Sequence, residues 1–119
     1  MSNFLSENEL KSIGIKRYGS NVLISRDAKF YSPHFIEVGD NVRIDDFCIL
    51  SGNIKIKDYV HISAYASIFA GNEGVEIESY VSISSRCAIY AISDDYSGMF
   101  LANPMVPLKC RKVIEKKFI

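Results

Sequence analysis

The sequence has no excess of charge of either sign, no long apolar run and few cysteines. Lysine plus arginine number 14, as do aspartate plus glutamate, so no overall field favours nucleic acid or an anionic membrane surface. No apolar stretch approaches the ~20 residues of a membrane-spanning helix, and residues 1–12 lack the regions of a secretion signal. We therefore expect a cytoplasmic protein with no membrane span and no nucleic-acid partner.

Signals for metal sites and for hairpins are also scarce. The three cysteines, Cys48, Cys87 and Cys110, are odd in number and lack metal-ligand spacing. A zinc enzyme of the β-helical carbonic-anhydrase kind needs three histidine ligands, whereas this chain supplies only His34 and His61. We therefore expect no metal. The absence of Asn-Gly pairs argues against a sandwich of antiparallel hairpins.

A six-residue repeat of aliphatic side chains occupies residues 38–93. Its first series is interrupted by an insertion at 71–76 and consists of Val38, Ile44, Leu50, Ile56, Ile62, Ile68, Ile77, Ile83 and Ile89. A second series follows four positions behind, with smaller or branched residues: Val42, Cys48, Ile54, Val60, Ala66, Val81, Cys87 and Ser93. A period of six fits neither a helix nor a hairpin, and internal repetition of this kind indicates a solenoid.

Three hexads combine into one coil of eighteen residues, so each hexad forms one flat side of a three-sided coil. Stacked coils give parallel sheets with neighbouring strands about 4.8 Å apart. The predicted buried columns are Val38 on Ile56 on Ile77, Ile44 on Ile62 on Ile83, and Leu50 on Ile68 on Ile89. This register separates Cys48 from Cys87 by two coils, about 9–10 Å, which is beyond the reach of a disulfide.

The corners between sides differ in chemistry, which supports the division into coils. The predicted corner sets are Asp40, Asp58 and Ser79, then Asp46, Ala64 and Ser85, then Gly52, Ala70 and Ala91. These positions lie in tight turns. We expect their Asp and Ser side chains to make local hydrogen bonds to the backbone.

Residues 1–17 lie outside the repeat and form an N-terminal capping segment. Ser6 and Glu9 have the spacing of a capping box, which predicts a helix over 7–13 that ends at Gly14. We expect this helix to cover the open end of the first coil, whose backbone edge and apolar side chains need a cover.

The remaining segments follow from where the repeat runs. Residues 18–93 form the coils of an all-β parallel β-helix, with an irregular first coil near Pro33 and His34. Residues 94–112 include two prolines and form a loop that leaves the helix. Residues 113–119 begin a further coil, which we interpret as truncated.

The hexads, together with the runs SSRCAIYAISDDYSG and NPMVP, resemble the hexapeptide-repeat acyltransferases of the galactoside and maltose O-acetyltransferase type. The likeness covers roughly residues 20–119, and the two runs are similar to acetyltransferases of surface-polysaccharide and sugar-nucleotide clusters. The resemblance implies a left-handed parallel β-helix, a homotrimer, acetyl-CoA in a cleft between adjacent prisms, and an acceptor pocket built by the loop at 94–112.

The function implied by this resemblance is acetyl-CoA-dependent transfer to a hydroxyl or amine of a sugar or sugar nucleotide in polysaccharide biosynthesis. The alternative is a non-catalytic, degenerate β-helix that serves as an assembly module. Measured acetyl transfer or acetyl-CoA binding discriminates between the two. Aligned by hexads, Asp94 falls where the galactoside acetyltransferase type has its histidine base.

Acyl transfer needs a base that takes a proton as the thioester carbonyl is attacked. His61 is one candidate, on an outward position stacked between Arg43 and Ser82, although the same position suits a solvated histidine. Asp94 and Asp95 are further candidates as bases, and equally good turn formers.

Contacts to a sugar hydroxyl are the second requirement of the predicted reaction. Tyr96 and Asn103 carry suitable side chains within the predicted loop, and both are also suited to pinning that loop in place. The residues that bind the acyl donor are not identified by the pattern.

Overall fold

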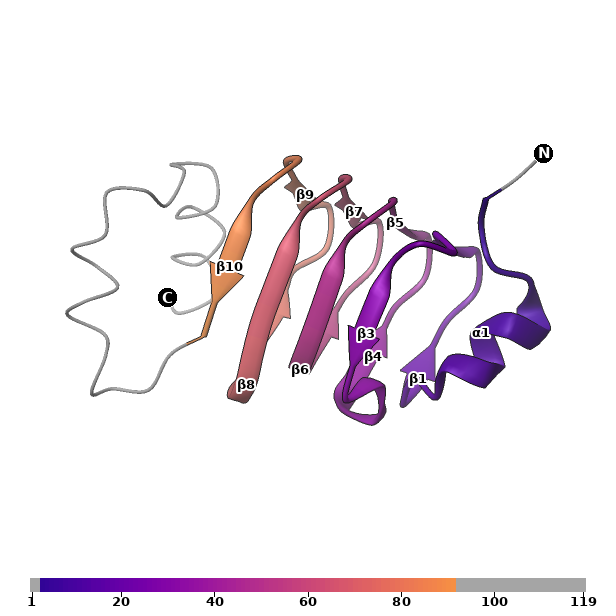
Figure 1. Ribbon diagram of the computed structural model, residues 1–119, viewed down its shortest axis with the longest axis horizontal. Helices are drawn as coiled ribbons and strands as arrows, with labels where there is room; N and C mark the ends of the chain where they lie inside the picture. The colour runs from indigo at the N-terminus through magenta and orange to yellow at the C-terminus, as the bar shows by residue number, and fades with distance from the viewer. Residues whose placement is uncertain (1–2, 92–119) are drawn as a thin grey trace, which may run out of the picture.

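Buried aliphatic side chains at the predicted six-residue spacing form the centre of a stack of coils. The computed structural model describes residues 3–91 of the chain, and residues 1–2 and 92–119 are not described. The strands lie on the sides of a prism, with successive coils following one another along its long axis (Figure 1). All pairings between named strands are parallel within the described residues. The prediction of a parallel β-helix is therefore confirmed.

Strands from successive coils define three sides of the prism. Side A consists of β2 (Val22–Ile24), β5 (Val42–Ile44), β7 (His61–Ile62) and β9 (Ser82–Ile83). Side B consists of β3 (Lys29–Tyr31), the first parts of β6 (Ile49–Ile56) and β8 (Ser67–Ile77), and β10 (Ala88–Tyr90). Side C consists of β1 (Arg17–Tyr18), β4 (Ile36–Val38) and the last parts of β6 and β8.

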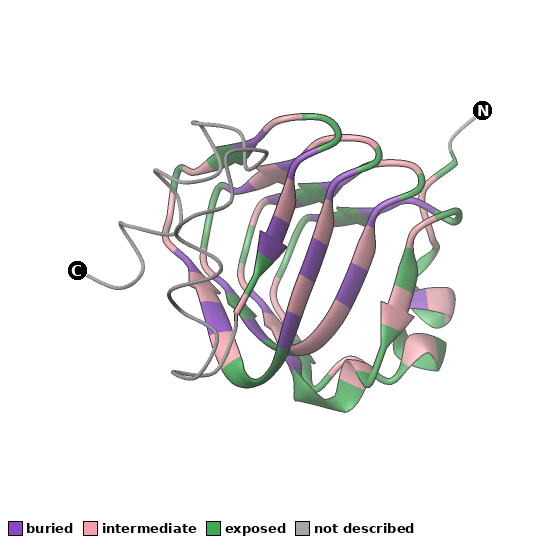
Figure 2. Ribbon diagram, turned by 60° about the vertical axis from the view of Figure 1, so that its left-hand side comes forward, coloured by how far each residue is buried: buried purple, intermediate pink, exposed green. Residues whose placement is uncertain are grey.

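The predicted columns of buried residues are confirmed by the strand register. The paired positions are Val38 with Ile56 and Ile56 with Ile77, Ile44 with Ile62 and Ile62 with Ile83, and Leu50 with Ile68 and Ile68 with Ile89. Each of these side chains is at most 3% exposed. Buried and more exposed positions alternate along the strands (Figure 2), so inward residues of all sides share one core.

The third predicted corner set is wrong, because β8 contains a bulge. Gly52 pairs with Gly71, whereas the prediction put it beside Ala70. Ala70 is fully buried and does not lie at a corner. The register shifts at Gly52, and the extra residues of β8 are accommodated there without disturbing the columns on either side. Gly52 itself has φ +93°, in the left-handed region that favours glycine.

The corner between sides C and A is held by hydrogen bonds that run from coil to coil. The backbone N–H of Ser20 donates to Asp40 Oδ1 at 2.8 Å, and that of Asp40 donates to Asp58 Oδ1 at 2.8 Å. The backbone N–H of Asp58 donates to Ser79 Oγ at 3.2 Å. The expected local turn bonds are therefore corrected: these side chains cap the backbone of the preceding coil.

The N-terminal helix α1 (Glu7–Ile13) has the predicted bounds and the predicted capping box between Ser6 and Glu9. Gly14 ends it in the left-handed conformation, at φ +89°. Leu10 is 4% exposed and belongs to the core, so the helix covers the first coil as expected (Figure 1). No helix among residues 3–91 has the length and apolarity needed to cross a membrane.

The irregular first coil is also confirmed. A 3-10 helix, η1 (Pro33–Phe35), occupies the predicted position between β3 and β4. Ile36 and Val38 on either side of Glu37 are buried, and they pair with Ile54 and Ile56 of the next coil. The two extra residues of this coil therefore change the corner and leave the register of side C intact.

Candidate functional site

Polar side chains gather on the outward positions of side A and on the corner that follows it. Because Ile44, Ile62 and Ile83 point inward, the residues on either side of each point outward. One outward column is Arg43, His61 and Ser82, and the next is Asp45, Ser63 and Ser84. The predicted placement of His61 between Arg43 and Ser82 is confirmed.

His61 is held by a carboxylate from the preceding coil. Its Nε2 lies 2.8 Å from Asp45 Oδ2, and Arg43 Nε donates to Asp45 Oδ1 at 2.7 Å. The side chain of Asp45 is 20% exposed, whereas those of His61 and Arg43 are 43% and 55% exposed. The carboxylate is thus the sheltered centre of the group, and the imidazole remains open to a ligand.

The environment of Asp45 favours its ionised form. Partial burial opposes ionisation, but hydrogen bonds from His61 and Arg43 outweigh it and bring the pKa of Asp45 below its ordinary value. At neutral pH the carboxylate is therefore charged and accepts hydrogen bonds on both oxygens.

A hollow of about 350 Å³ lies beside Asp45, between the N-terminal segment and the corner after side A. It is lined by Asn3, Phe4, Arg43, Asp45, Asp46 and Ala64. The guanidinium carbon of Arg43 lies 5.5 Å from the centroid of the Phe4 ring, a cation–π geometry. Asn3 Nδ2 donates to Asp46 Oδ1 at 3.1 Å and to Asp27 Oδ2 at 2.9 Å.

Exposed aromatic rings follow on the same corner. Phe47 and Tyr65 stack with their centroids 5.2 Å apart, and the guanidinium of Arg86 lies 4.9 Å from the Tyr65 centroid. All three residues have left-handed backbone, with φ between +62° and +67°. Such a conformation is uncommon outside glycine, and stacking from coil to coil offsets its cost.

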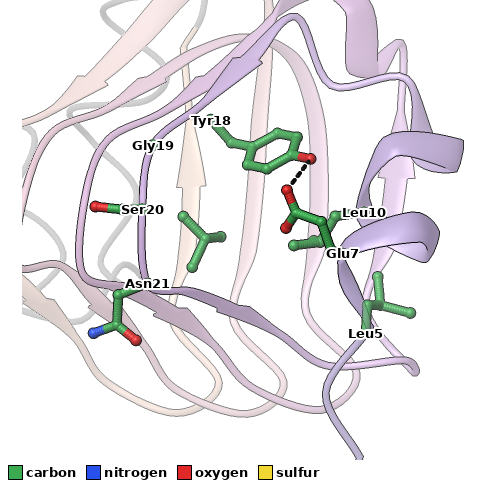
Figure 3. Close-up of a pocket in the computed structure, with 8 residues that line it drawn as sticks. Leu5, Glu7, Leu10, Tyr18, Gly19, Ser20 and Asn21 are labelled. Carbon is green, nitrogen blue, oxygen red and sulfur yellow. Dashed lines mark hydrogen bonds between the residues drawn. The ribbon is translucent and has the colours of Figure 1, made fainter.

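A larger hollow of about 510 Å³ lies at the end of the prism, between α1 and the first coil (Figure 3). Leu5, Leu10 and Val22 supply its apolar wall. Tyr18 Oη donates to Glu7 Oε1 at 3.3 Å across it, as the dashed line in Figure 3 shows. Burial is the main cause that raises the pKa of Tyr18, followed by the charge of Glu7. This hollow shares no residue with the group around His61.

The described residues contain no cluster of three or more His, Cys, Asp and Glu side chains that could hold a metal ion. Cys48 is a free, buried cysteine whose Sγ donates to the carbonyl of Ser63 at 3.1 Å. Burial raises the pKa of its thiol, so the group is an inert part of the core. The prediction that Cys48 and Cys87 do not pair with each other is confirmed.

The structure places one of the predicted catalytic residues and leaves the others untested. His61 lies on the outward polar face, whereas Asp94, Asp95, Tyr96 and Asn103 lie outside the described residues. Sequence reasoning missed Asp45 as the partner of His61. The alternation along the strand placed Asp45 on the same outward face as Arg43, but it did not specify the bond to His61.

Comparison with known proteins relates the chain to sugar-nucleotide acyltransferases. Residues 35–70 match the family described as bacterial transferase hexapeptide (six repeats). A dTDP-4-amino-4,6-dideoxy-D-glucose acyltransferase of Escherichia coli is 49% identical over 107 residues, which cover 87% of this chain and 55% of that protein.

Solved structures of AntD, an N-acyltransferase from Bacillus cereus, have the same fold. Its S84C variant, in complex with dTDP-4-amino-4,6-dideoxyglucose and coenzyme A, is 48% identical with a TM-score of 0.76, covering 90% of this chain and 57% of AntD. AntD with dTDP and 3-hydroxybutyryl-CoA is 49% identical at the same TM-score of 0.76, covering 92% of this chain and 58% of AntD. A D94A variant, with dTDP and coenzyme A, is 48% identical, covering 92% of this chain and 59% of AntD, again with a TM-score of 0.76.

The parallel β-helix of hexapeptide repeats, with its polar outward face, defines the class of protein that the chain resembles. Residues 35–70 carry the repeats of the bacterial hexapeptide transferase family, and most of the chain is similar to sugar-nucleotide acyltransferases. The chain spans a little over half the length of the relatives it matches.

Proposed function

We propose that the chain carries part of an acyltransferase that transfers an acyl group from acyl-CoA to the amino group of a nucleotide-linked sugar. The observation that carries this proposal is the imidazole of His61, held by the charged Asp45 on an exposed polar face. Its support comes from relatives at 48–49% identity, which are described with coenzyme A, 3-hydroxybutyryl-CoA and a dTDP-amino sugar. Acetyl-CoA is the simplest donor to test.

The reaction requires proton removal from the attacking nitrogen. The amine attacks the thioester carbonyl, a C–N bond forms and the C–S bond breaks. The sulfur leaves as the coenzyme A thiolate and takes up a proton, while the nitrogen gives its proton to a base on the protein. Such a positioned base contributes about 10²–10⁴ in rate.

His61, Asp94 and Asp95 are the proposed proton acceptors, of which His61 is the one that lies among the described residues. Structures of AntD include variants of a serine and of an aspartate, the residue types of Ser84 and Asp94 in this chain. Ser84 follows Ile83 on side A and is the next outward residue after Ser82. Ser82 is the residue that pairs with His61 of the preceding coil. Ser84 therefore joins the proposed site, with Tyr96 and Asn103 as proposed contacts to the sugar.

Acyl transfer can be followed as release of the coenzyme A thiol. Purified protein is mixed with acetyl-CoA or 3-hydroxybutyryl-CoA and with dTDP-4-amino-4,6-dideoxyglucose, and the acylated sugar is identified by mass spectrometry. His61→Gln, Asp94→Asn and Asp95→Asn are compared, and loss of the true base should lower kcat by about 10²–10⁴. His34→Gln is the matched control, since His34 is exposed beside Phe35 and lies apart from side A.

The competing function is a non-catalytic β-helix that acts as an assembly module. Protein that binds neither acyl-CoA nor the dTDP-sugar in calorimetry contradicts the acyltransferase proposal for this chain and favours the module. Binding of these ligands without turnover also argues against the module, because a module has no need of either ligand.

We further propose that copies of the chain associate as a homotrimer through side B. From the second coil onward the outward residues of this side carry no charge: Ile49, Ser51, Ser67, Phe69, Ala88 and Tyr90. Side C differs, with Arg17, Glu37, Lys55 and Glu76 in one outward column. Uncharged, partly aromatic surface is typical of the centre of an interface.

Light scattering tests this assembly. We expect three copies per particle, and monomers after Phe69→Lys, whose ring stacks on Tyr90 with centroids 5.3 Å apart. Lys55→Glu on side C is the control and should leave the mass unchanged. A monomeric wild-type protein contradicts the proposal.

We place the reaction in the cytoplasm and in the synthesis of surface polysaccharides. The support is the nature of the ligands described for the relatives, a coenzyme A thioester and a nucleotide-linked sugar. Cell fractionation tests the location, and the loss of an acylated sugar from the cell surface after deletion of the gene tests the pathway.

A further inference from the structure

The carboxylate of Asp45 links two side chains that come from neighbouring coils. Arg43 and Asp45 flank the buried Ile44 and both point outward, while His61 lies beside Arg43 in the next coil. Because Arg43 takes one carboxylate oxygen and His61 the other, the position of the carboxylate is fixed on both sides. The imidazole is thus held at one defined nitrogen.

The charge of Asp45 decides which nitrogen of His61 carries the proton. An ionised carboxylate has no hydrogen to donate, so the 2.8 Å contact requires Nε2 of His61 to be the donor. In the neutral imidazole the other nitrogen, Nδ1, then has the free lone pair. Within residues 3–91, Nδ1 makes no hydrogen bond of its own, and the side chain is 43% exposed.

We propose that Asp45 is a positioning residue, which holds His61 as the Nε2–H tautomer and presents Nδ1 as the proton acceptor for the substrate amine. This inference rests on the proposed acyl transfer for its use, but the tautomer is a property of the protein alone. The proton taken from the amine goes to Nδ1, and the resulting imidazolium is stabilised by the charge of Asp45. Asp45 itself stays ionised throughout.

The N-terminal segment supports this arrangement through Arg43. Phe4 forms an isolated antiparallel bridge with Ser25, and the backbone N–H of Leu5 donates to the carbonyl of Ile24 at 2.9 Å. The ring of Phe4 is thereby placed against the guanidinium of Arg43, 5.5 Å from its centroid. The N-terminal segment therefore contacts the site through the ring of Phe4, which packs against Arg43.

Neighbouring charges do not compete for His61. The adjacent carboxylate, Asp46, accepts hydrogen bonds from Ser25 Oγ and from Asn3 Nδ2, so it is bound to the N-terminal side of the corner. The residue opposite His61 in the following coil is Ser82, which is uncharged. Among the described charged groups on side A and its following corner, Asp45 is therefore the partner of the imidazole.

Nitrogen-15 NMR of the two histidines tests the tautomer directly. The chain contains only His34 and His61, and His34→Gln assigns the signals. Above the pH at which the rings lose their extra proton, His61 should show a protonated Nε2 and a free Nδ1. His34, exposed against Phe35, serves as the internal reference for an unconstrained ring. An Nδ1–H tautomer at His61 overturns the proposal.

Substitutions of Asp45 separate positioning from packing. Asp45→Ala should shift the tautomer populations of His61 toward those of His34. Asp45→Asn has one accepting oxygen, for which Arg43 and His61 compete, and an NH2 group that donates, so it should also weaken the preference of His61 for the Nε2–H form. A population in Asp45→Ala equal to that of the wild type contradicts the inference. Far-UV circular dichroism shows whether each variant is folded, and the Asn variant keeps the test valid if the Ala variant is not.

Turnover gives the second readout. A misplaced base costs up to about 10²-fold, so Asp45→Ala should lower kcat by that order with KM for acyl-CoA unchanged. Phe4→Leu should lower kcat by about two- to fivefold through loss of the cation–π contact, and Phe35→Leu should not. A wild-type Nε2–H tautomer without any acyl transfer refutes the proposed function, whereas transfer with the Nδ1–H tautomer refutes the positioning role alone.

Discussion

The backbone N–H of Asp40 donates a hydrogen bond to Oδ1 of Asp58, which is the corresponding corner residue of the next coil. The distance is 2.8 Å, and the pattern repeats from Ser20 to Asp40 and from Asp58 to Ser79. A corner side chain thus satisfies a backbone donor that the sheets on either side leave unpaired. Such contacts tie the coils together where no strand is present.

Removing this corner acceptor should destabilise the stack. Asp58→Ala leaves the N–H of Asp40 without its partner, and we expect the free energy of unfolding to fall by about 0.5–1.5 kcal/mol. Asp58→Asn keeps an acceptor oxygen and should lose less. Urea unfolding followed by circular dichroism measures both, and equal losses in the two variants would contradict the role of the hydrogen bond.

The attachment of the capping helix should weaken in acid. Glu9 accepts hydrogen bonds from Arg26, which is its main partner, and from Ser6, and these lower its pKa from 4.5 to about 2. A carboxyl whose pKa is lowered in the folded state stabilises that state at pH values above the pKa it has in the unfolded chain. This contribution is lost as the pH falls from 4.5 toward 2. Unfolding measured between pH 6 and pH 3 should therefore show a steeper loss of stability in the wild type than in Glu9→Gln.

A single core residue should show the strength of the buried columns. Ile62 is fully buried and pairs with Ile44 and Ile83, so Ile62→Ala should lower the free energy of unfolding by about 2–5 kcal/mol. Leu23→Ala is the matched control on the same side, because Leu23 is 38% exposed and its loss should be much smaller. Comparable losses would mean that side A is not packed as described.

Two paired glycines should differ in their tolerance of a side chain. A Cβ at Gly52 would lie 2.5 Å from the backbone nitrogen of Gly71, whereas a Cβ at Gly71 meets nothing within 4 Å. Both have positive φ, so each alanine variant carries a cost of about 1–2 kcal/mol for the left-handed backbone. Gly52→Ala should lose clearly more stability than Gly71→Ala, as measured by the thermal midpoint, and the reverse order would contradict the geometry of the bulge.

The hexad pattern predicted the register of the sheets because each coil contributes one buried side chain to each column. Val38, Ile56 and Ile77 illustrate this, since a shift by one residue would turn all of them outward. The pattern could not predict the pairing of Gly52 with Gly71. The interruption of the repeat at 71–76 located the added residues, but a bulge changes spacing without changing which residues are apolar, so the pattern did not specify which residues pair across it.

The candidate site was predicted only in part. The column of Arg43, His61 and Ser82 follows directly from the register. The bond from His61 to Asp45 runs diagonally between coils, and it depends on side-chain rotamers that a periodic pattern does not specify. The predicted residues of the loop at 94–112 lie outside the described residues, so those assignments stay predictions.

The number of residues between stacked side chains differs from coil to coil, as the column of Ile24, Ile44, Ile62 and Ile83 shows. The added residues fall at the corner between sides B and C, as η1 in one coil and as the bulge of β8 in another. The corner after side A, which carries Asp45, keeps the same length throughout. Protein engineers therefore have a natural attachment point. An affinity tag or a fluorescent reporter inserted near Asn72 or Glu73 should leave both the strand register and the His61 face undisturbed.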